Sequence, residues 1–219
     1  MPLQREDVAR AALRVLDEVG LDGLTMRRLA AELNIQGASL YWHFTNKQEL
    51  INCMAEVIVA DAFADLRPPE ADQDWTTWMA GYARLLRRMA MSHRDGARTL
   101  AEADLSLGLF MSGGDLATRV LLDAGFEARQ AWGCVVTLLS FVLGGSFEVQ
   151  ADPSHRLLLE SGRSEPPQPL VVDPERFPTV AHIMEKVDLW PASPDIWFEQ
   201  GLRMLLDGMQ VALIRGREY

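Results

Sequence analysis

The sequence predicts an all-α fold, with a small three-helix unit at the N-terminus followed by a larger helical domain. Apolar residues recur at helical spacing along most of the chain, and no segment alternates with period two over a useful length. Capping residues and glycine or proline breaks divide this pattern into segments of helical length. Of the 219 residues, 48% are apolar, which is enough for a sizeable core. We expect one domain over residues 1–46 and another over residues 47–219, with a linking helix at about 47–66.

The N-terminal unit is predicted from three short helical patterns in succession. Gly20 is a C-cap candidate that ends the first helix, and Thr25 is placed to cap the second. Asn34 tolerates a left-handed turn, and a short third helix follows from about Gly37 to His43. The apolar positions of the first two helices are Val8, Ala12, Val15, Leu16, Val19, Leu29, Ala30 and Leu33.

The remaining helices follow from similar signals. Asn46 and Glu49 have the spacing of a capping box and open a long helix over residues 47–66, which Pro68 and Pro69 end. A turn is expected over residues 92–96, and Gly125 is expected to close a helix. Further helices are predicted over residues 75–91, 107–124, 126–149, 174–187 and 194–215. Residues 151–174 hold five prolines, one glycine and three serines, which predicts a long flexible loop.

Two of these helices are unusually apolar. Residues 131–147 contain 17 consecutive uncharged residues, whereas a membrane span needs about 20. Because this run is short and contains glycine, serine and threonine, it predicts a buried helix, and no membrane partner is expected. The helix over 194–215 is apolar on more than one face, so it is expected to meet its own core on one side and a second subunit on the other.

Charge and cysteine content indicate the cellular compartment of the protein. The formal net charge is −10, but residues 1–50 hold six basic and seven acidic side chains, so the acidity lies mostly in the remainder of the chain. No apolar run follows a basic start, so no secretory signal is expected. Two cysteines, Cys53 and Cys134, form neither a disulfide framework nor a structural zinc site. These features predict a cytoplasmic protein.

Residues 26–43 have the pattern of a helix-turn-helix, in which two short helices are joined by a tight turn. The second helix of this motif enters the major groove of DNA and presents its first residues to base edges. Gly37 and Ala38 are small enough for a close approach, and the Ala38 methyl group can pack on a thymine methyl group. Gln36 and Ser39 can hydrogen-bond base edges or phosphates.

Residues 20–50, GLDGLTMRRLAAELNIQGASLYWHFTNKQEL, resemble the DNA-binding domain of the TetR family of bacterial transcriptional regulators. A Gly-Leu-Thr entry, a Leu-Ala-x-x-Leu brace, a small-residue turn, Leu-Tyr-x-His-Phe and x-x-Lys-x-x-Leu occur in the family's order and spacing. The Leu-Tyr-Trp-His run resembles the tetracycline repressor class. The resemblance implies a homodimeric repressor that binds a palindromic double-stranded DNA operator and is released by a small-molecule effector. It places the DNA contacts on Thr25, Arg27, Gln36, Gly37, Ala38, Ser39, Tyr41, Trp42, His43 and Lys47.

The resemblance also places the effector site, on Phe63, Tyr82, Leu86, Leu100, Phe141 and Glu148. The tetracycline repressor holds a magnesium–drug complex, and the resemblance puts Leu100 where that protein has a magnesium-binding histidine. Phe63 and Tyr82 stand where it has a histidine and an asparagine that contact the drug. One carboxylate does not make a site for a hard cation. We therefore expect a largely hydrophobic effector, no metal and no cofactor. Gly37-Ala38-Ser39 also replaces Gln-Pro-Thr of that repressor, so a different operator is expected.

Other interpretations of the same residues are open at this point. Tyr41 and Trp42 can be core residues of a small helical unit, His43 can be structural, and the effector positions can belong to a filled core. His93 and Asp95 are expected to hold a turn by polar contacts, because no third group orients them for acid–base chemistry. An alternative function is an all-helical small-molecule-binding protein or enzyme that retains the helix-turn-helix as a scaffold. No activated nucleophile or phosphate-binding loop supports an enzyme.

Overall fold

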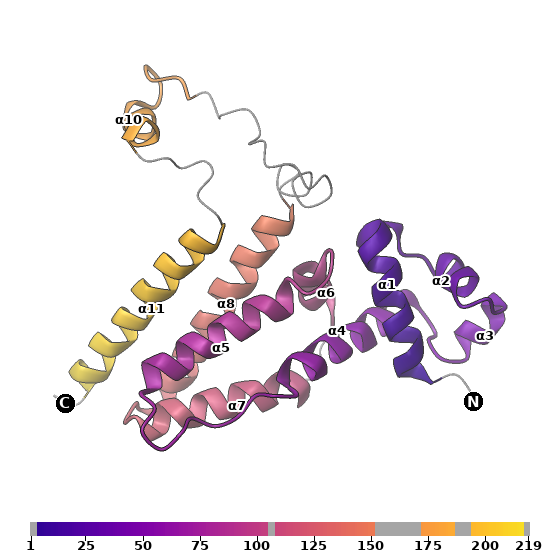
Figure 1. The fold of residues 1–219 in the computed structure, drawn as a ribbon, viewed down its shortest axis with the longest axis horizontal. Helices are drawn as coiled ribbons and strands as arrows, with labels where there is room; N and C mark the ends of the chain where they lie inside the picture. The colour runs from indigo at the N-terminus through magenta and orange to yellow at the C-terminus, as the bar shows by residue number, and fades with distance from the viewer. Residues whose placement is uncertain (1–3, 105–107, 152–171, 187–193, 217–219) are drawn as a thin grey trace.

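The computed structural model describes residues 4–104, 108–151, 172–186 and 194–216, and these segments are helical without a β-strand (Figure 1). The predicted all-α class is confirmed. The helices are α1 (Arg5–Gly23), α2 (Met26–Glu32), α3 (Gly37–Tyr41), α4 (Lys47–Phe63), α5 (Trp75–Ala90), α6 (Gly96–Glu102), α7 (Gly108–Asp123), α8 (Ala128–Ala151), α10 (Pro178–Lys186) and α11 (Pro194–Gly216).

Helices α1, α2 and α3 form the expected three-helix unit at one end of the molecule (Figure 1). Thr25 caps α2 as predicted, because its hydroxyl accepts a 3.1 Å hydrogen bond from the Arg28 backbone N–H. At Gly20 the backbone leaves helical geometry (φ 71°, ψ 175°), but the helix then resumes and ends at Gly23. The buried residues that hold the unit together include Val8, Ala12, Leu16, Leu29, Leu40 and Phe44.

The turn before α3 has the predicted conformation, with Asn34 in the left-handed region at φ 51°. Helix α3 is shorter than expected and ends at Tyr41 instead of His43. The reason is local, since the backbone N–H groups of His43 and Phe44 both donate to the Leu40 carbonyl at 3.0 Å. Leu40 and Phe44 are fully buried, so this tight turn fixes α3 on the unit beneath it.

Helix α4 links the N-terminal unit to the rest of the chain. The Asn46 side chain accepts a 2.9 Å hydrogen bond from the Glu49 N–H, as a helix cap does. The Glu49 carboxylate accepts from the backbone N–H and the hydroxyl of Thr45 (3.0 and 2.7 Å) instead of from the Asn46 N–H, so only half of the predicted capping box forms. These bonds lower the pKa of Glu49. The helix ends at Phe63, three residues before the predicted end at Leu66.

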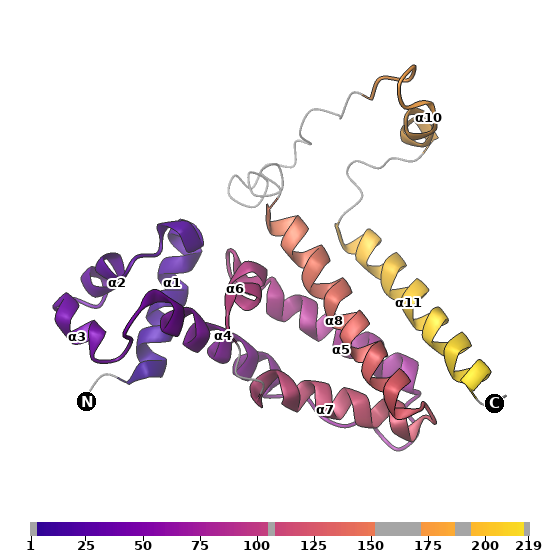
Figure 2. The same ribbon diagram turned by 180° about the vertical axis from the view of Figure 1, so that it is seen from behind.

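Helices α5, α6, α7, α8 and α11 form the body (Figure 2). The bounds of α5, α7, α8 and α11 agree with the predicted segments to within two residues at each end. Helix α6 was not predicted, because the sequence indicated only a turn near its start. Asp95 precedes α6 in the left-handed conformation (φ 54°). Gly125, at φ 102°, closes α7 as expected.

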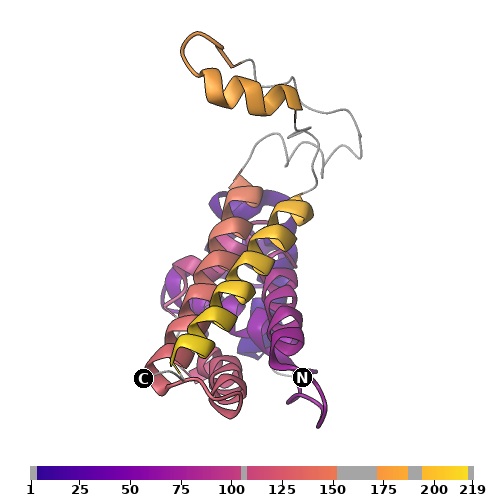
Figure 3. The same cartoon turned by 90° about the vertical axis from the view of Figure 1, so that its left-hand side faces the viewer.

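Most of the predicted loop over residues 151–174, residues 152–171, lies outside the described residues. Helix α10 is shorter than the predicted 174–187 segment, and it stands away from the body (Figure 3). Its exposed apolar side chains include Val180 and Ile183, and Phe177 just before the helix is also exposed.

The prediction that residues 131–147 are buried is wrong for one side of α8. Ala131, Val135 and Leu138 face the core, but Trp132 and Val136 on the other side remain 46% and 44% exposed. Within the described segments, α8 alone is long and apolar enough to cross a membrane, and 22% of its most apolar window is buried. Helices α8 and α11 lie side by side (Figure 3), and each carries exposed apolar side chains.

Candidate nucleic-acid interface and effector site

The start of α3 is exposed, and its side chains contribute little to the core. Gln36, Gly37, Ala38 and Ser39 are all exposed, and a Cβ atom added to Gly37 would meet no atom within 4 Å. Beneath them, Leu40 is fully buried. The helix therefore presents its first turn outward while one leucine holds it in place.

The three aromatic residues that follow differ in exposure. Tyr41 is 54% exposed and Trp42 is 89% exposed, whereas Phe44 is fully buried. The Arg5 guanidinium lies 4.4 Å from the centroid of the Phe44 ring and donates to the His43 carbonyl, so α1 holds the end of this turn. A tryptophan with most of its surface in water contributes little to this chain's own core, and it is available to a partner.

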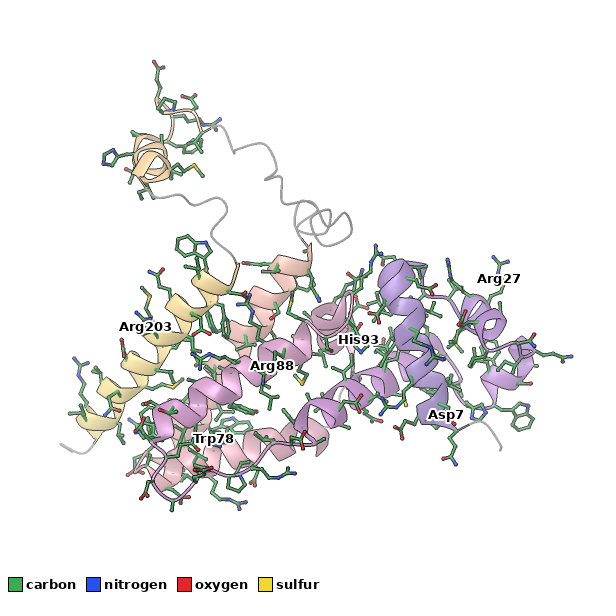
Figure 4. The ribbon with its side chains drawn as sticks, in the orientation of Figure 1. Asp7, Arg27, Trp78, Arg88, His93 and Arg203 are labelled. Atoms are coloured by element: carbon green, nitrogen blue, oxygen red, sulfur yellow. The ribbon has the colours of Figure 1, made fainter. Side chains whose placement is uncertain are left out.

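The flanking residues differ in their availability. Arg27 is exposed on the outer side of α2, away from the body (Figure 4). Thr25 is exposed and uses its hydroxyl as the α2 cap. Lys47 is half-buried, and its Nζ donates a 2.8 Å hydrogen bond to the Leu21 carbonyl. Sequence reasoning missed this second role of Lys47, because its partner lies 26 residues away in the chain.

The residues assigned to the effector site form two groups. Phe63 and Tyr82 lie together, with ring centroids 6.3 Å apart, and Tyr82 stacks on Trp78 at 5.4 Å. Burial raises the pKa of the Tyr82 hydroxyl. Leu86 and Leu100 are buried in the same core. We call these four residues of α4, α5 and α6, which are Phe63, Tyr82, Leu86 and Leu100, the effector cluster.

The other two assigned residues, Phe141 and Glu148, are on α8. Phe141 on α8 stacks on Phe198 of α11, at 5.6 Å between centroids. Glu148 is exposed near the end of α8. Sequence reasoning missed Gly113, where an added Cβ would lie 2.5 Å from the Phe63 ring and 3.0 Å from the Tyr82 hydroxyl. The available signal was the Gly113-Gly114 pair in an apolar helix.

Comparison with known proteins agrees with this architecture. Residues 9–54 match the family model for bacterial regulatory proteins of the tetR family, and residues 67–213 match the tetracyclin repressor-like C-terminal domain. The chain belongs to the TetR family. Members of this family are ligand-responsive transcriptional repressors with a helix-turn-helix, and dimerisation is typical of them. The relatives are transcriptional regulators, which are not enzymes, and the family acts in the cytoplasm.

Three TetR-family relatives cover nearly the whole chain. Tetracycline repressor protein class A from transposon 1721 of Escherichia coli is 38% identical over 207 residues, 94% of this chain and 90% of that protein. A possible TetR-family regulator from Streptomyces coelicolor A3(2) is 33% identical, with a TM-score of 0.81 over 95% of this chain and 100% of the other. ActR of Streptomyces coelicolor, in complex with (S)-DNPA, is 27% identical, with a TM-score of 0.76 over 97% and 100% of the two chains.

In this TetR-family chain, polar contacts join the end of α1 to the turn before α6. The Asp17 carboxylate lies 2.9 Å from His93 Nδ1 and accepts a 3.0 Å hydrogen bond from the Arg94 backbone N–H. The Asp95 carboxylate accepts a 2.8 Å hydrogen bond from the Leu21 N–H. His93 and Asp95 make polar contacts, but their side-chain partners are on α1 instead of within the turn, so the contacts tie the DNA-binding unit to the body.

Proposed function

We propose that the chain is a cytoplasmic repressor that binds a two-fold operator as a homodimer through α3 and is released by a largely apolar small molecule. The division into residues 1–46 for DNA binding and 47–219 for effector binding and dimerisation is part of this proposal. The observation that carries it is the exposure of Trp42 at 89%, next to the exposed start of α3. In a helix-turn-helix, the equivalent surface faces the major groove.

The apolar surface of α8 and α11 supports the dimer. Helices that are apolar on two sides need a second partner, and here the partner is a second copy of the chain. Such a copy would place the two recognition helices to read half-sites about 34–36 Å apart. The exposed apolar side chains of this surface are Trp132, Val136, Phe147, Ile196, Trp197, Met204, Val211 and Ile214.

The apolar cluster of Phe63, Tyr82, Leu86 and Leu100 supports a largely hydrophobic effector. Leu100 is 3% exposed and offers no ligand to a metal, so this position does not favour a magnesium–drug complex. The printed names of relatives point to different molecules, since one is named for tetracycline and another was solved in complex with (S)-DNPA. We therefore assign the apolar effector to this cluster and keep Phe141 and Glu148 as proposed members of the site.

The path from effector to DNA runs through α4 and α6. Phe63 ends α4, whose other end at Lys47 is bonded to the Leu21 carbonyl. Leu100 belongs to α6, whose preceding turn holds α1 through Asp95. A shift of either helix would turn the DNA-binding unit. A coupling free energy of about 1–3 kcal/mol between effector and operator changes the operator affinity roughly 5–150-fold.

The test is a gel shift with the DNA upstream of the protein's own gene, at low salt and with random DNA as competitor. We expect a specific complex that Tyr41→Ala weakens. Glu56→Ala, which alters an exposed residue on α4, serves as the control and should leave the affinity unchanged. Equal affinity for the upstream and the random DNA would refute the repressor and favour the alternative of a small-molecule-binding protein with a helix-turn-helix scaffold.

A further inference from the structure

A pocket lies between α4 and α5, close to the DNA-binding unit, and none of the residues assigned to the effector site lines it. Its volume is about 340 Å³, within the range of small-molecule sites in proteins. Arg88 and His93 lie toward the α6 end of α5 (Figure 4). We call this the joint pocket, and it is lined by Ile58, Asp61, Ala62, Leu85, Arg88, Met89, Ser92 and His93.

In the joint pocket the negative charge of Asp61 has a partner, whereas the positive charge of Arg88 has none in the described segments. The Asp61 carboxylate accepts two hydrogen bonds from the Arg10 guanidinium, at 2.9 and 2.8 Å, so its charge is already paired. The Arg88 side chain is exposed and makes no hydrogen bond or ion pair with any residue in the described segments. A guanidinium binds carboxylates in a forked geometry. The unmatched charge of the pocket is therefore positive, beside a wall formed by Ile58, Ala62 and Leu85.

The joint pocket and the effector cluster share no residue. Tyr82 and Leu86 point into the core and are 4% and 0% exposed. On α5 the joint pocket is lined by Leu85, Arg88 and Met89, and Ser92 and His93 follow the end of the helix. Neither Phe63 nor Tyr82 lines the joint pocket.

Two lining residues of the joint pocket also hold α1. Asp61 is bonded to Arg10, and His93 Nδ1 lies 2.9 Å from the Asp17 carboxylate. A molecule in the pocket would contact Asp61 and His93, two of the residues that bond to α1. Its binding would therefore alter the position of the DNA-binding unit without passing through the effector cluster.

We propose that the joint pocket binds a small anion with an apolar body, such as an aromatic carboxylate, and that this second ligand modulates operator binding. The carboxylate pairs with Arg88, and the apolar body lies against Ile58, Ala62 and Leu85. The binding part of the proposal is independent of the proposed repressor function, whereas the modulation of operator binding rests on it.

The binding test uses 2-naphthoate and its uncharged analogue 2-naphthamide as probes, with isothermal titration calorimetry of the full chain. The wild-type protein is expected to bind naphthoate about tenfold more tightly than naphthamide, the contribution of one charge-assisted hydrogen-bonded pair. Arg88→Gln removes this preference. Arg84→Gln is the matched control, because it deletes a charge of the same helix that is paired with Glu199 and does not line the pocket. Equal naphthoate affinity in wild type and Arg88→Gln overturns the proposal.

A steric variant locates the apolar body of the probe. Ala62→Leu fills part of the joint pocket and is expected to weaken both probes, while Tyr82→Leu in the effector cluster leaves them unchanged. The reverse result would place naphthoate in the effector cluster and overturn the site. In a gel shift, saturating naphthoate is expected to change operator affinity in wild type and not in Arg88→Gln. Unchanged operator affinity in wild type, with calorimetric binding intact, overturns the modulation alone.

Discussion

Replacing Gly20 by alanine is expected to destabilise the chain at the point where the DNA-binding unit meets the body. Gly20 has φ 71° and ψ 175°, a region occupied almost only by glycine, and a side chain there costs about 1–3 kcal/mol. The added Cβ would also lie 2.7 Å from Asp95 Oδ2, the atom that accepts the hydrogen bond from the Leu21 N–H. Loss of that bond adds roughly 1 kcal/mol or more. The expected total is therefore about 2–4 kcal/mol.

The assay is urea unfolding at one fixed protein concentration, because the stability of a dimer depends on concentration. Gly81→Ala is the matched control. Gly81 is exposed in the middle of α5, an added Cβ meets nothing within 4 Å, and the change should stabilise the chain by about 0.5–1 kcal/mol. If Gly20→Ala lost less than about 1 kcal/mol, the strain and the Asp95 contact would not matter as argued.

Three further variants test the interface, the dimer and a helix cap. Trp42→Ala should weaken operator binding about tenfold in a gel shift while leaving urea unfolding unchanged, since the side chain is 89% exposed. Met204→Asp, at 64% exposure on α11, should convert the dimer to single chains in sedimentation, because a charge would be buried unpaired. Asp74→Ala should cost about 1 kcal/mol by removing the α5 cap. Hydrogen bonds from the Thr76 hydroxyl and the backbone lower the pKa of Asp74 from its usual value, so this stabilisation is present above that usual value and is lost as the pH falls through the lowered pKa.

Features that depend on neighbouring residues were predictable from the sequence. The Thr25 cap, the left-handed Asn34 and the closing Gly125 follow from residue type and position within one turn of a helix. The exposed start of α3 also followed, because its small residues interrupt an apolar pattern.

Features that depend on distant residues were not predictable. Helix α6 begins after Asp95, whose carboxylate is bonded to the N–H of Leu21, 74 residues earlier in the chain. The Lys47 ammonium likewise donates to the Leu21 carbonyl, 26 residues earlier in the chain. The joint pocket was not predictable for the same reason. Arg88 lines a pocket only because the fold brings it to the same site as Asp61, whose charge is paired with Arg10. A single sequence shows these residues but not their partners in the folded chain.

The exposed start of α3 affects how easily the regulator can change its operator over evolutionary time. Leu40 and Phe44 anchor the turn from below, whereas Gln36, Ala38 and Ser39 project into solvent with no structural duty. Substitutions at those three positions would alter which bases are read at almost no thermodynamic cost to the fold. Descendants of a duplicated gene could therefore acquire new operators by a few point mutations, each passing through a fully folded intermediate.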